Sequence, residues 1–523
     1  MGYVIAKKQN KIEKSCWNLI WYCVYFVSIF TFLIPMYRTA PLWLAITILS
    51  LGKWIFPACA SWWFLSPSFG YKTLEASAII PTEFLYGNHF WLGSKDECGL
   101  INNPKTVRLS ESHYIETNKH LLTKPTDLEF SYKVVWANIT RSPFEADNRY
   151  FRNMEILHLG LCLPITCAKH DLQIISTEYL SNNKTIPKRV FDMDVNNIEV
   201  NELILSADYV YKKTLITFGT ILLLTLIIIM LSLTPLKNTS GLKTVLNAFH
   251  PKQNFDTIFI WKPTKFPEIN GLKFFGAIMI LLFHVQFFGL YKLTSRFNGF
   301  VYAETLENQF ITTGGHFIEA FFCASGFLLT YNLLKNQKQA ETLAKASFLD
   351  TFKFLSLSLF KRLVRIVPLY VVMMLLTELA STYYTETAVI KLWDEDGFNC
   401  RNYWWRNLLF ISNFYPHYDM CMNWTWTISC EMQFYIYAIL LYVFYCKNER
   451  GAKIFFATTC GFITIISTYF LIKHDFKLTF DAMSKEGQLD DLYQHPLSRV
   501  PAYLVGIGMA YFLVKFGSNI SKV

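Results

Sequence analysis

The feature that most constrains this chain is a stretch without any charged residue, Thr214–Thr234. A helix of roughly 20 apolar residues crosses the hydrocarbon core of a bilayer, so this stretch predicts a membrane span. Trp17–Ile34 follows four lysines and predicts a signal sequence or an uncleaved anchor. Further spans are predicted at approximately 272–290, 311–333, 364–382, 424–446, 454–472 and 499–514.

Composition agrees with a membrane protein. Only 17% of the 523 residues are charged and 52% are hydrophobic, whereas soluble globular proteins carry about 25% charged residues. The net charge of +10 does not predict a nucleic-acid partner, because the lysines and arginines lie beside the apolar stretches rather than in one patch. The predicted fold is mainly α: a multi-pass transmembrane helical bundle with a small disulfide-bonded extracytoplasmic N-terminal domain.

Loop charge predicts the orientation. The segments 235–270, 335–363 and 447–453 are rich in lysine and arginine, whereas 383–422 and 473–498 are acidic on balance. Basic loops face the cytoplasm, so residues 66–213 are predicted to be extracytoplasmic, and we read the Trp-rich segment 41–65 as interfacial. The predicted organisation is a signal or anchor (1–40), an extracytoplasmic domain (41–213), a span (214–234), a cytoplasmic linker (235–270) and a membrane domain of about six helices (271–523).

The cysteines divide by this topology. Cys59, Cys98, Cys162 and Cys167 fall on the extracytoplasmic side, where disulfides persist, and their three possible pairings stay open. Cys400 and Cys421 share one outer loop and are candidates for a further bridge. Five others lie in apolar stretches and behave as small hydrophobic residues: Cys23, Cys323, Cys430, Cys446 and Cys460. Glycosylation sequons begin at Asn138 and Asn183 in the outer domain.

Polar residues inside the predicted spans are candidates for chemistry. His284 ends an apolar stretch and lies eleven residues after Lys273, about 16 Å along a helix and on the same face. A histidine there needs a polar cavity or a partner. It is therefore either a general base near neutral pH or a structural histidine bonded across helices.

Three further charged residues have two readings each. Glu431 lies in an apolar stretch, where it either orients His284 or pairs with an arginine or lysine of the bundle. Arg362 and Arg365 lie one turn apart; they either bind phosphate through their guanidinium donors or anchor a helix end. No metal site is predicted, since the Cys162 to Cys167 spacing lacks the second pair that zinc requires.

Two local patterns resemble a known N-terminal domain. They are Gly87-Asn-His-Phe-Trp-Leu-Gly-Ser-Lys-Asp-Glu-Cys98 and Leu159-Gly-Leu-Cys-Leu-Pro-Ile-Thr-Cys167, and they resemble the N-terminal domain of the nose resistant to fluoxetine family. The later chain resembles the acyltransferase type three domain of that family. The segments that carry this resemblance include Lys273 to His284, Glu319-Ala-Phe-Phe-Cys-Ala-Ser-Gly-Phe, Arg362-Leu-Val-Arg-Ile-Val-Pro, Asn423-Trp-Thr-Trp to Glu431, and His495-Pro-Leu-Ser-Arg499.

The resemblance implies transfer of an acyl group from an acyl-CoA to a hydroxyl of a lipid or glycan. His284, with Glu431 beside it, would be the catalytic residue, and Lys273, Arg362 and Arg365 would hold the donor, a co-substrate rather than a permanently bound cofactor. A carrier or receptor for lipids or small hydrophobic molecules is the alternative. The family also implies further helices after the sixth, so the stop at Val523 predicts a short or inactive member. The membrane is predicted to be the plasma membrane or the endoplasmic reticulum.

Overall fold

The computed structural model describes a large part of the chain. The described residues are 76–77, 88–102, 108–110, 113–114, 129–141, 156–181, 194–203, 212–233, 246–260, 265–290, 293, 295–391, 396–474 and 488–520. The predicted signal or anchor Trp17–Ile34 and the Trp-rich segment 41–65 lie outside them.

The N-terminal domain is built on a four-stranded sheet with strand order β1-β5-β4-β6. Its strands are β1 (Phe90–Trp91), β4 (Phe130–Arg141), β5 (Ile156–Pro164) and β6 (Asp194–Glu202); β1 runs parallel to β5, and the other pairs are antiparallel. A separate two-stranded ribbon joins β2 (Arg108–Ser110) and β3 (His113–Tyr114).

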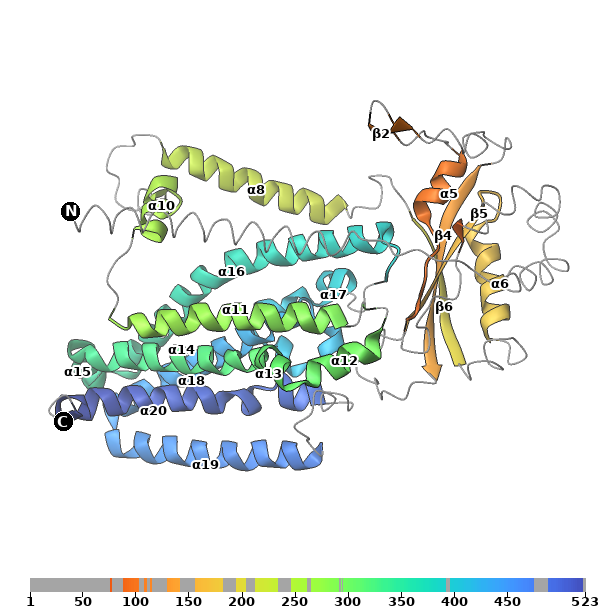
Figure 1. The fold of residues 1–523 in the computed structure, drawn as a ribbon. Helices are drawn as coiled ribbons and strands as arrows, with labels where there is room; N and C mark the ends of the chain where they lie inside the picture. The colour runs from red at the N-terminus through yellow and green to blue at the C-terminus, as the bar shows by residue number, and fades with distance from the viewer. Residues whose placement is uncertain are drawn as a thin grey trace, which may run out of the picture. The chain divides into compact units, whose positions relative to one another are not determined.

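Central strand β4 alternates its side chains between two cores, as a strand must. Val134 and Trp136 belong to a buried cluster with α5 (Lys95–Asn102), whereas Val135 packs with Leu172 of α6 (Lys169–Ser181). The helices α5 and α6 therefore cover opposite faces of the sheet (Figure 1).

Two disulfides fix the cysteine pairing that the sequence left open. Cys98 of α5 bonds to Cys162 of β5, and Cys400 bonds to Cys421 as predicted. Cys167 is also disulfide-bonded. The described cysteines of the apolar stretches (Cys323, Cys430, Cys446 and Cys460) are free thiols.

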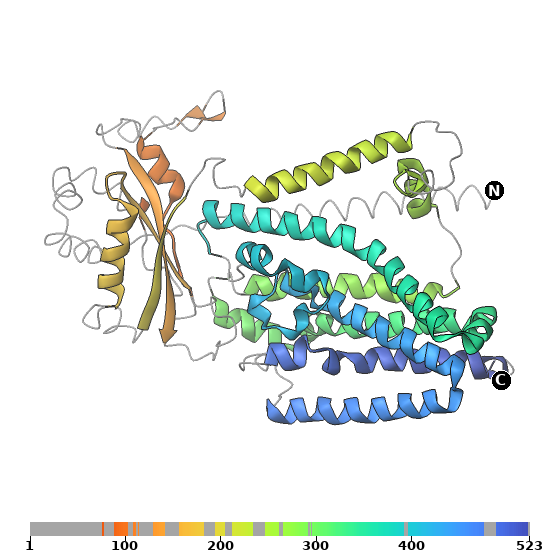
Figure 2. The same ribbon diagram turned by 180° about the vertical axis from the view of Figure 1, so that it is seen from behind.

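The helical part confirms a multi-pass membrane protein. Within the described ranges, seven helical segments are long and apolar enough to cross a membrane. Each predicted span from 272 onward lies within one of them, and the predicted span 214–234 overlaps the segment Thr214–Ser232. The long helices are α8 (Lys212–Ser232), α11 (Pro267–Leu290), α14 (Phe317–Lys335), α16 (Phe348–Thr387), α18 (Trp426–Lys447), α19 (Glu449–Lys473) and α20 (Pro496–Ile520) (Figures 1 and 2).

One segment differs from the sequence expectation. Residues 335–363, read as a basic loop, form α15 (Gln337–Lys345) and the first part of α16. Ser347 caps α16, because its hydroxyl accepts a hydrogen bond from the Asp350 amide at 3.2 Å. The remaining short helices are α10 (Pro251–Phe259), α12 (Arg296–Glu304), α13 (Leu306–Thr312) and α17 (Asp396–Leu408), with short turns η4 (Thr313–His316), η5 (Ser412–Phe414), η6 (His417–Asp419), η7 (Asn423–Thr425) and η9 (Leu489–Tyr493).

Two glycines bring α14 and α20 into close contact, as small residues do between membrane helices. A Cβ on Gly326 would lie 2.5 Å from the Tyr503 carbonyl oxygen, and one on Gly506 would lie 2.1 Å from the Cys323 carbonyl oxygen. The fully buried Tyr503 then packs with Phe434 at the centre of the largest core.

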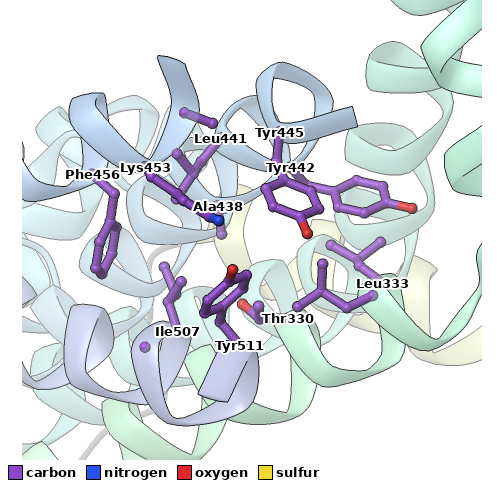
Figure 3. A pocket seen from close by; sticks show the side chains of 13 residues that line it. Thr330, Leu333, Ala438, Leu441, Tyr442, Tyr445, Lys453, Phe456, Ile507 and Tyr511 are labelled. Atoms are coloured by element: carbon purple, nitrogen blue, oxygen red, sulfur yellow. The ribbon is translucent and has the colours of Figure 1, made fainter. Parts of the chain in front are cut away.

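The bundle has two chemically distinct ends. We call the end that carries the Cys400–Cys421 bridge the disulfide end, and the end that carries Lys335, Lys345 and Lys447 the basic end. In the half nearer the basic end, a cavity of about 190 Å³ opens between α14, α18, α19 and α20 (Figure 3).

Candidate functional site

His284 lies on α11, six residues before the helix ends, which is about 9 Å along the axis and in the half nearer the disulfide end. Its Nδ1 lies 2.7 Å from the carbonyl oxygen of Ile280, one turn earlier. A carbonyl oxygen only accepts hydrogen bonds, so Nδ1 carries a proton, and in the neutral ring Nε2 then presents a lone pair. Nε2 has no hydrogen-bond partner among the described residues.

The surroundings of His284 are aromatic. The imidazole stacks on Phe288 at 5.9 Å between ring centroids and meets the Phe283 ring edge-on at 5.3 Å. Helix α11 is held here by Gly314 of η4, where a Cβ would lie 2.4 Å from the Met279 carbonyl oxygen. The close approach fixes the backbone that carries His284, while the ring itself stays half-exposed.

Glu431 lies in a different polar cluster. Its Oε1 accepts a hydrogen bond from the Ser325 hydroxyl and pairs with Arg362 at 2.8 Å. The Arg362 guanidinium also lies over the Tyr435 ring, 4.3 Å from its centroid. Three motif segments that are far apart in sequence, on α14, α16 and α18, therefore meet at one point.

This geometry decides between the two readings of Glu431. The carboxylate pairs with an arginine of the bundle, and no described contact joins it to His284. Both side chains of the pair are largely buried, at 20% exposed for Arg362 and 24% for Glu431. The pair consequently acts as a tie between α16 and α18.

The three residues predicted to hold the donor have different surroundings. Arg362 commits part of its guanidinium to Glu431. Arg365, one turn further along α16, is exposed, and Lys273 is half-buried on α11. Neither Arg365 nor Lys273 has an ion-pair or hydrogen-bond partner within the described part of the chain, so both are available to an anionic ligand.

A second ion pair between motif segments was not predicted. Arg499 of α20 pairs with Glu319 of α14 and donates from Nε to the Tyr493 carbonyl oxygen at 2.6 Å. Its guanidinium also lies over the rings of Trp426 and Tyr493, 5.3 and 5.2 Å from their centroids. Both charged residues belong to motif segments of the sequence analysis, but no local pattern indicates that they meet.

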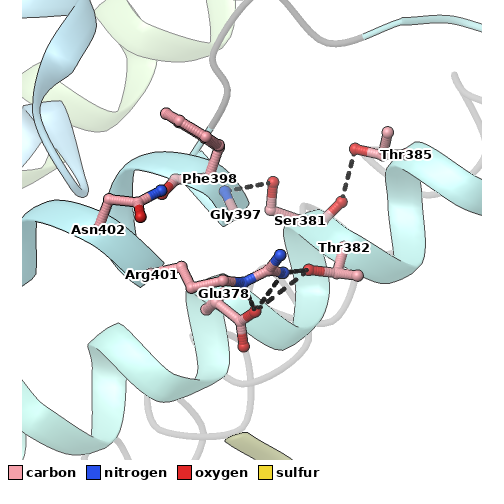
Figure 4. A network of polar contacts seen from close by, with 8 residues as sticks. All are labelled: Glu378, Ser381, Thr382, Thr385, Gly397, Phe398, Arg401 and Asn402. Atoms are coloured by element: carbon pink, nitrogen blue, oxygen red, sulfur yellow. Dashed lines mark hydrogen bonds and ion pairs between the residues drawn. The ribbon is translucent and has the colours of Figure 1, made fainter. Parts of the chain in front are cut away.

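A third polar group lies at the disulfide end. Glu378 is buried on α16 and accepts from Arg401 of α17 at 2.8 Å, and Ser381 accepts from the Gly397 amide at 3.0 Å (Figure 4). The pairing fastens α17 to α16. Glu378 lies within the predicted span 364–382, and an acidic residue at such a position indicates a buried partner.

Asp396, at the start of α17, is buried and accepts a hydrogen bond from the Met422 amide at 3.1 Å. Burial raises the pKa of this carboxyl to about 6, and the amide offsets part of that rise. Burial also changes the pKa of His417 in η6, but in the opposite direction. It lowers the pKa of the imidazole, against smaller opposing effects of Gln494 and Asp490.

Among the described residues, no group of three or more histidine, cysteine, aspartate or glutamate side chains is arranged to hold a metal ion. The arrangement offers one imidazole with an open lone pair, two unpaired basic side chains and three ion pairs that tie helices together. An imidazole lone pair can accept a proton, and unpaired lysine and arginine side chains can bind an anion.

Comparisons with known proteins match both parts of the chain. Residues 67–176 match the model of the nose resistant-to-fluoxetine protein N-terminal domain, and residues 266–522 match an acyltransferase domain. The chain is 25% identical over 496 residues to nose resistant to fluoxetine protein 6 of Caenorhabditis elegans, an alignment that covers 85% of this chain and 58% of that protein. The chain thus spans little more than half the length of this relative. No solved structure matches.

Proposed function

Since the chain belongs to the nose resistant to fluoxetine family and carries an acyltransferase domain, we propose that it transfers an acyl group within the membrane. The donor is an acyl-CoA and the acceptor is a hydroxyl of a lipid or glycan. In the transfer, the acceptor oxygen bonds to the thioester carbonyl carbon, the carbon–sulfur bond breaks, and the acceptor's proton ends on the departing thiol.

The observation that carries this proposal is the hydrogen bond of His284 to its own helix. Because Nδ1 donates to the Ile280 carbonyl oxygen at 2.7 Å, the neutral ring presents Nε2 as a proton acceptor. A general base needs that lone pair within reach of the acceptor hydroxyl. The base takes the hydroxyl proton as the oxygen attacks, and the imidazolium then returns it to the leaving thiolate.

The donor's phosphates require cationic side chains. Arg365 and Lys273 have no partner among the described residues, whereas Arg362 is paired with Glu431. We therefore assign Arg365 and Lys273 the larger share of donor binding and give Arg362 a positioning role. The aromatic rings of Phe283 and Phe288 beside His284 would exclude water from the reacting thioester.

The disulfides support the predicted orientation. Cys98–Cys162 lies in the sheet domain, and Cys400–Cys421 lies at the disulfide end of the bundle, and disulfides persist in oxidising compartments. We propose that both face the extracytoplasmic side of the plasma membrane or the endoplasmic reticulum. His284 would then meet its acceptor from that side or from the lipid.

The direct test is His284→Ala in protein purified into lipid nanodiscs. Radiolabelled acyl-CoA is supplied with hydroxyl-bearing lipids and monosaccharides, and transfer of the label is measured. We expect a loss of at least about 100-fold, the usual contribution of a general base. The matched control is His316→Ala, since His316 is an exposed histidine of η4 outside the proposed site. Equal rates for wild type and His284→Ala would remove the assignment.

A non-catalytic carrier for lipids or small hydrophobic molecules remains the second candidate. The observation that favours it is the lack of any described acidic partner for His284, since catalytic imidazoles are commonly oriented by a second group. Transport of a fluorescent lipid in liposomes, without any thioester and unaffected by His284→Ala and Arg365→Ala, would establish the carrier and reject the transferase.

A further inference from the structure

We propose that the cavity in the basic half of the bundle binds the acyl chain of a single-chain anionic lipid, with the lipid's head group at Lys453. The cavity lies between α14, α18, α19 and α20, and no residue of α11, the helix that carries His284, lines it. The inference goes beyond the proposed transfer and does not require it, because it concerns binding at a separate place.

The walls of the cavity suit a hydrocarbon chain. They are almost entirely apolar, with Leu333, Leu441, Phe456 and Ile507 among the lining side chains. The volume of about 190 Å³ exceeds that of the engineered apolar cavity of about 150 Å³ that stays dry and accepts benzene, so it holds on the order of six to eight carbon atoms. The cavity offers water few hydrogen-bond partners, whereas a hydrocarbon chain would make van der Waals contact with its apolar walls.

Polar groups gather on one side of this apolar space. In Figure 3 the amine of Lys453 and the hydroxyl of Tyr511 lie close to one another beside it. The Lys453 amine lies 5.4 Å from the centroid of the Tyr511 ring. An apolar pocket with a few convergent polar groups is the usual form of a small-molecule site.

The charge at this side favours an anion. Glu449 is shared by two lysines, with Lys453 at 2.8 Å and Lys515 at 3.6 Å. Among the described residues, one carboxylate against two amines leaves one positive charge without a counter-charge. A carboxylate or phosphate head group beside Lys453 would neutralise it, and the flexible lysine can reach that group while its alkyl stem lines the cavity.

Small residues keep the cavity open. Gly508 lines it, and a Cβ built there would meet nothing within 4 Å, whereas a Cβ on Gly506 would strike the α14 backbone. Two glycines of α20 that are separated by one residue therefore have different consequences. Gly506 allows close contact with α14, and Gly508 leaves space in the cavity. Ala438 and Ala452 complete the small surface on α18 and α19.

The test fills the cavity without disturbing its walls. Gly508→Leu places a side chain in open space and removes a helix-destabilising glycine, so the variant is expected to fold. The matched control is Gly461→Leu on α19, where a Cβ also meets nothing within 4 Å and the residue is exposed away from the cavity. Both proteins are incubated in nanodiscs with a decanoic acid that carries a terminal diazirine, irradiated, and mapped by mass spectrometry.

We expect labelling of wild type and Gly461→Leu on the cavity segments of α18 or α20, and at least a tenfold loss in Gly508→Leu. Lys453→Gln should lower labelling by the acid but not by the matching diazirine alcohol, because only the acid carries a charge. Competition with decanoic acid, a lysophosphatidate and an acyl-CoA then identifies which anionic head group the site prefers.

Labelling that maps outside the cavity, or that Gly508→Leu leaves unchanged, would overturn the proposal, as would equal loss in both glycine variants. His284→Ala separates this site from the transfer reaction: it should abolish transfer and leave labelling intact. A protein that binds the probe but transfers no acyl group would therefore reject the proposed function and keep the lipid site.

Discussion

The two halves of the bundle differ in their buried polar side chains and in how tightly they are packed. Among the described residues, four polar side chains have no exposed surface at all (Asn407, Ser412, Ser429 and Gln494), and all lie in the half nearer the disulfide end. Each is hydrogen-bonded: Asn407, for example, donates to the Cys421 carbonyl oxygen at 2.7 Å, and Ser412 bonds to Ser429 at 2.9 Å. The basic half instead holds an apolar cavity with charges at its rim.

The difference indicates that the polar groups of the disulfide half stabilise the fold, whereas those of the basic half face a space that a ligand can occupy. A buried polar group is costly unless it is bonded, so the dense bonding of the disulfide half holds its helices and its loops in one arrangement. The basic half keeps a cavity, which costs packing energy, and such volume is worth keeping where a ligand fills it. In the disulfide half, the Nε2 of His284 has no partner among the described residues.

The largest predicted effect on stability comes from the removal of Glu431, and it tests the difference between bonded and unbonded polar groups. Glu431→Ala leaves the largely buried guanidinium of Arg362 without its counter-charge and should lower the free energy of unfolding by about 3 kcal/mol. His284→Ala, which removes no cross-helix hydrogen bond among the described residues, should change it by less than about 1 kcal/mol. Unfolding by sodium dodecyl sulfate in mixed micelles measures both.

A double variant provides the control for Glu431→Ala. Arg362→Met with Glu431→Met removes both charges and keeps volume, so it should be more stable than Glu431→Ala alone, because replacing a buried pair by apolar side chains is often nearly neutral. If Glu431→Ala matched wild type, the Arg362–Glu431 pair would not be a tie between α16 and α18.

The next effect concerns the disulfide end itself. Cys400→Ala with Cys421→Ala opens a bridge between residues 21 apart in sequence, which should cost about 3 kcal/mol through the freed unfolded chain. Because Asp396 and Asn407 both bond to the Met422–Cys421 backbone, proteolysis should first cut near residues 415–422. Cleavage that begins at the basic end instead would contradict this prediction.

Two glycines of α20 allow the packing of its α14 side and of its cavity side to be compared within one helix. Gly506→Ala puts a Cβ 2.1 Å from the Cys323 carbonyl oxygen, so α14 and α20 must separate, at about 2 kcal/mol. Gly508→Ala enters open space and should stabilise the helix by up to about 1 kcal/mol. The same micelle titration compares them, and equal effects would show that the cavity side of α20 is as tightly packed as its α14 side.

Sequence reasoning recovered the spans of the described part of the chain, because a bilayer imposes a length and an apolar composition that can be read from a single sequence. It also selected Cys400 and Cys421 as a pair and Glu431 as a residue that needs a partner. It left the four-stranded sheet unpredicted, because polar residues interrupt the apolar pattern of its strands, as in β6, Asp194–Glu202.

What the sequence could not supply is which polar residues meet. Arg362 and Glu431 are separated by a whole helix and a loop, and Glu319 and Arg499 by most of the bundle. Such pairings depend on how helices rotate and cross, and those are settled by packing features such as Gly326 and Gly506 rather than by local pattern. Gly506 and Gly508 look alike in sequence, and only the neighbouring helix distinguishes them.

The smallest predicted effect depends on pH and comes from Asp396. Burial raises its pKa to about 6 from the ordinary 3.8, so the folded protein holds the proton more tightly than the unfolded chain. That contribution to stability is complete below the ordinary pKa and is lost as the pH rises through about 6. Between pH 5 and pH 7.5 the loss is about 1 kcal/mol.

Asp396→Asn keeps the acceptor for the Met422 amide and cannot titrate, so it should flatten this part of the pH dependence. His417 contributes with the opposite sign, because a lowered pKa costs stability as the pH falls. The difference between wild type and Asp396→Asn at each pH, from thermal unfolding in micelles, isolates the carboxyl. A difference that stayed constant from pH 5 to 7.5 would show that Asp396 is ionised throughout, and that water reaches the disulfide end more freely than its dense hydrogen bonding implies.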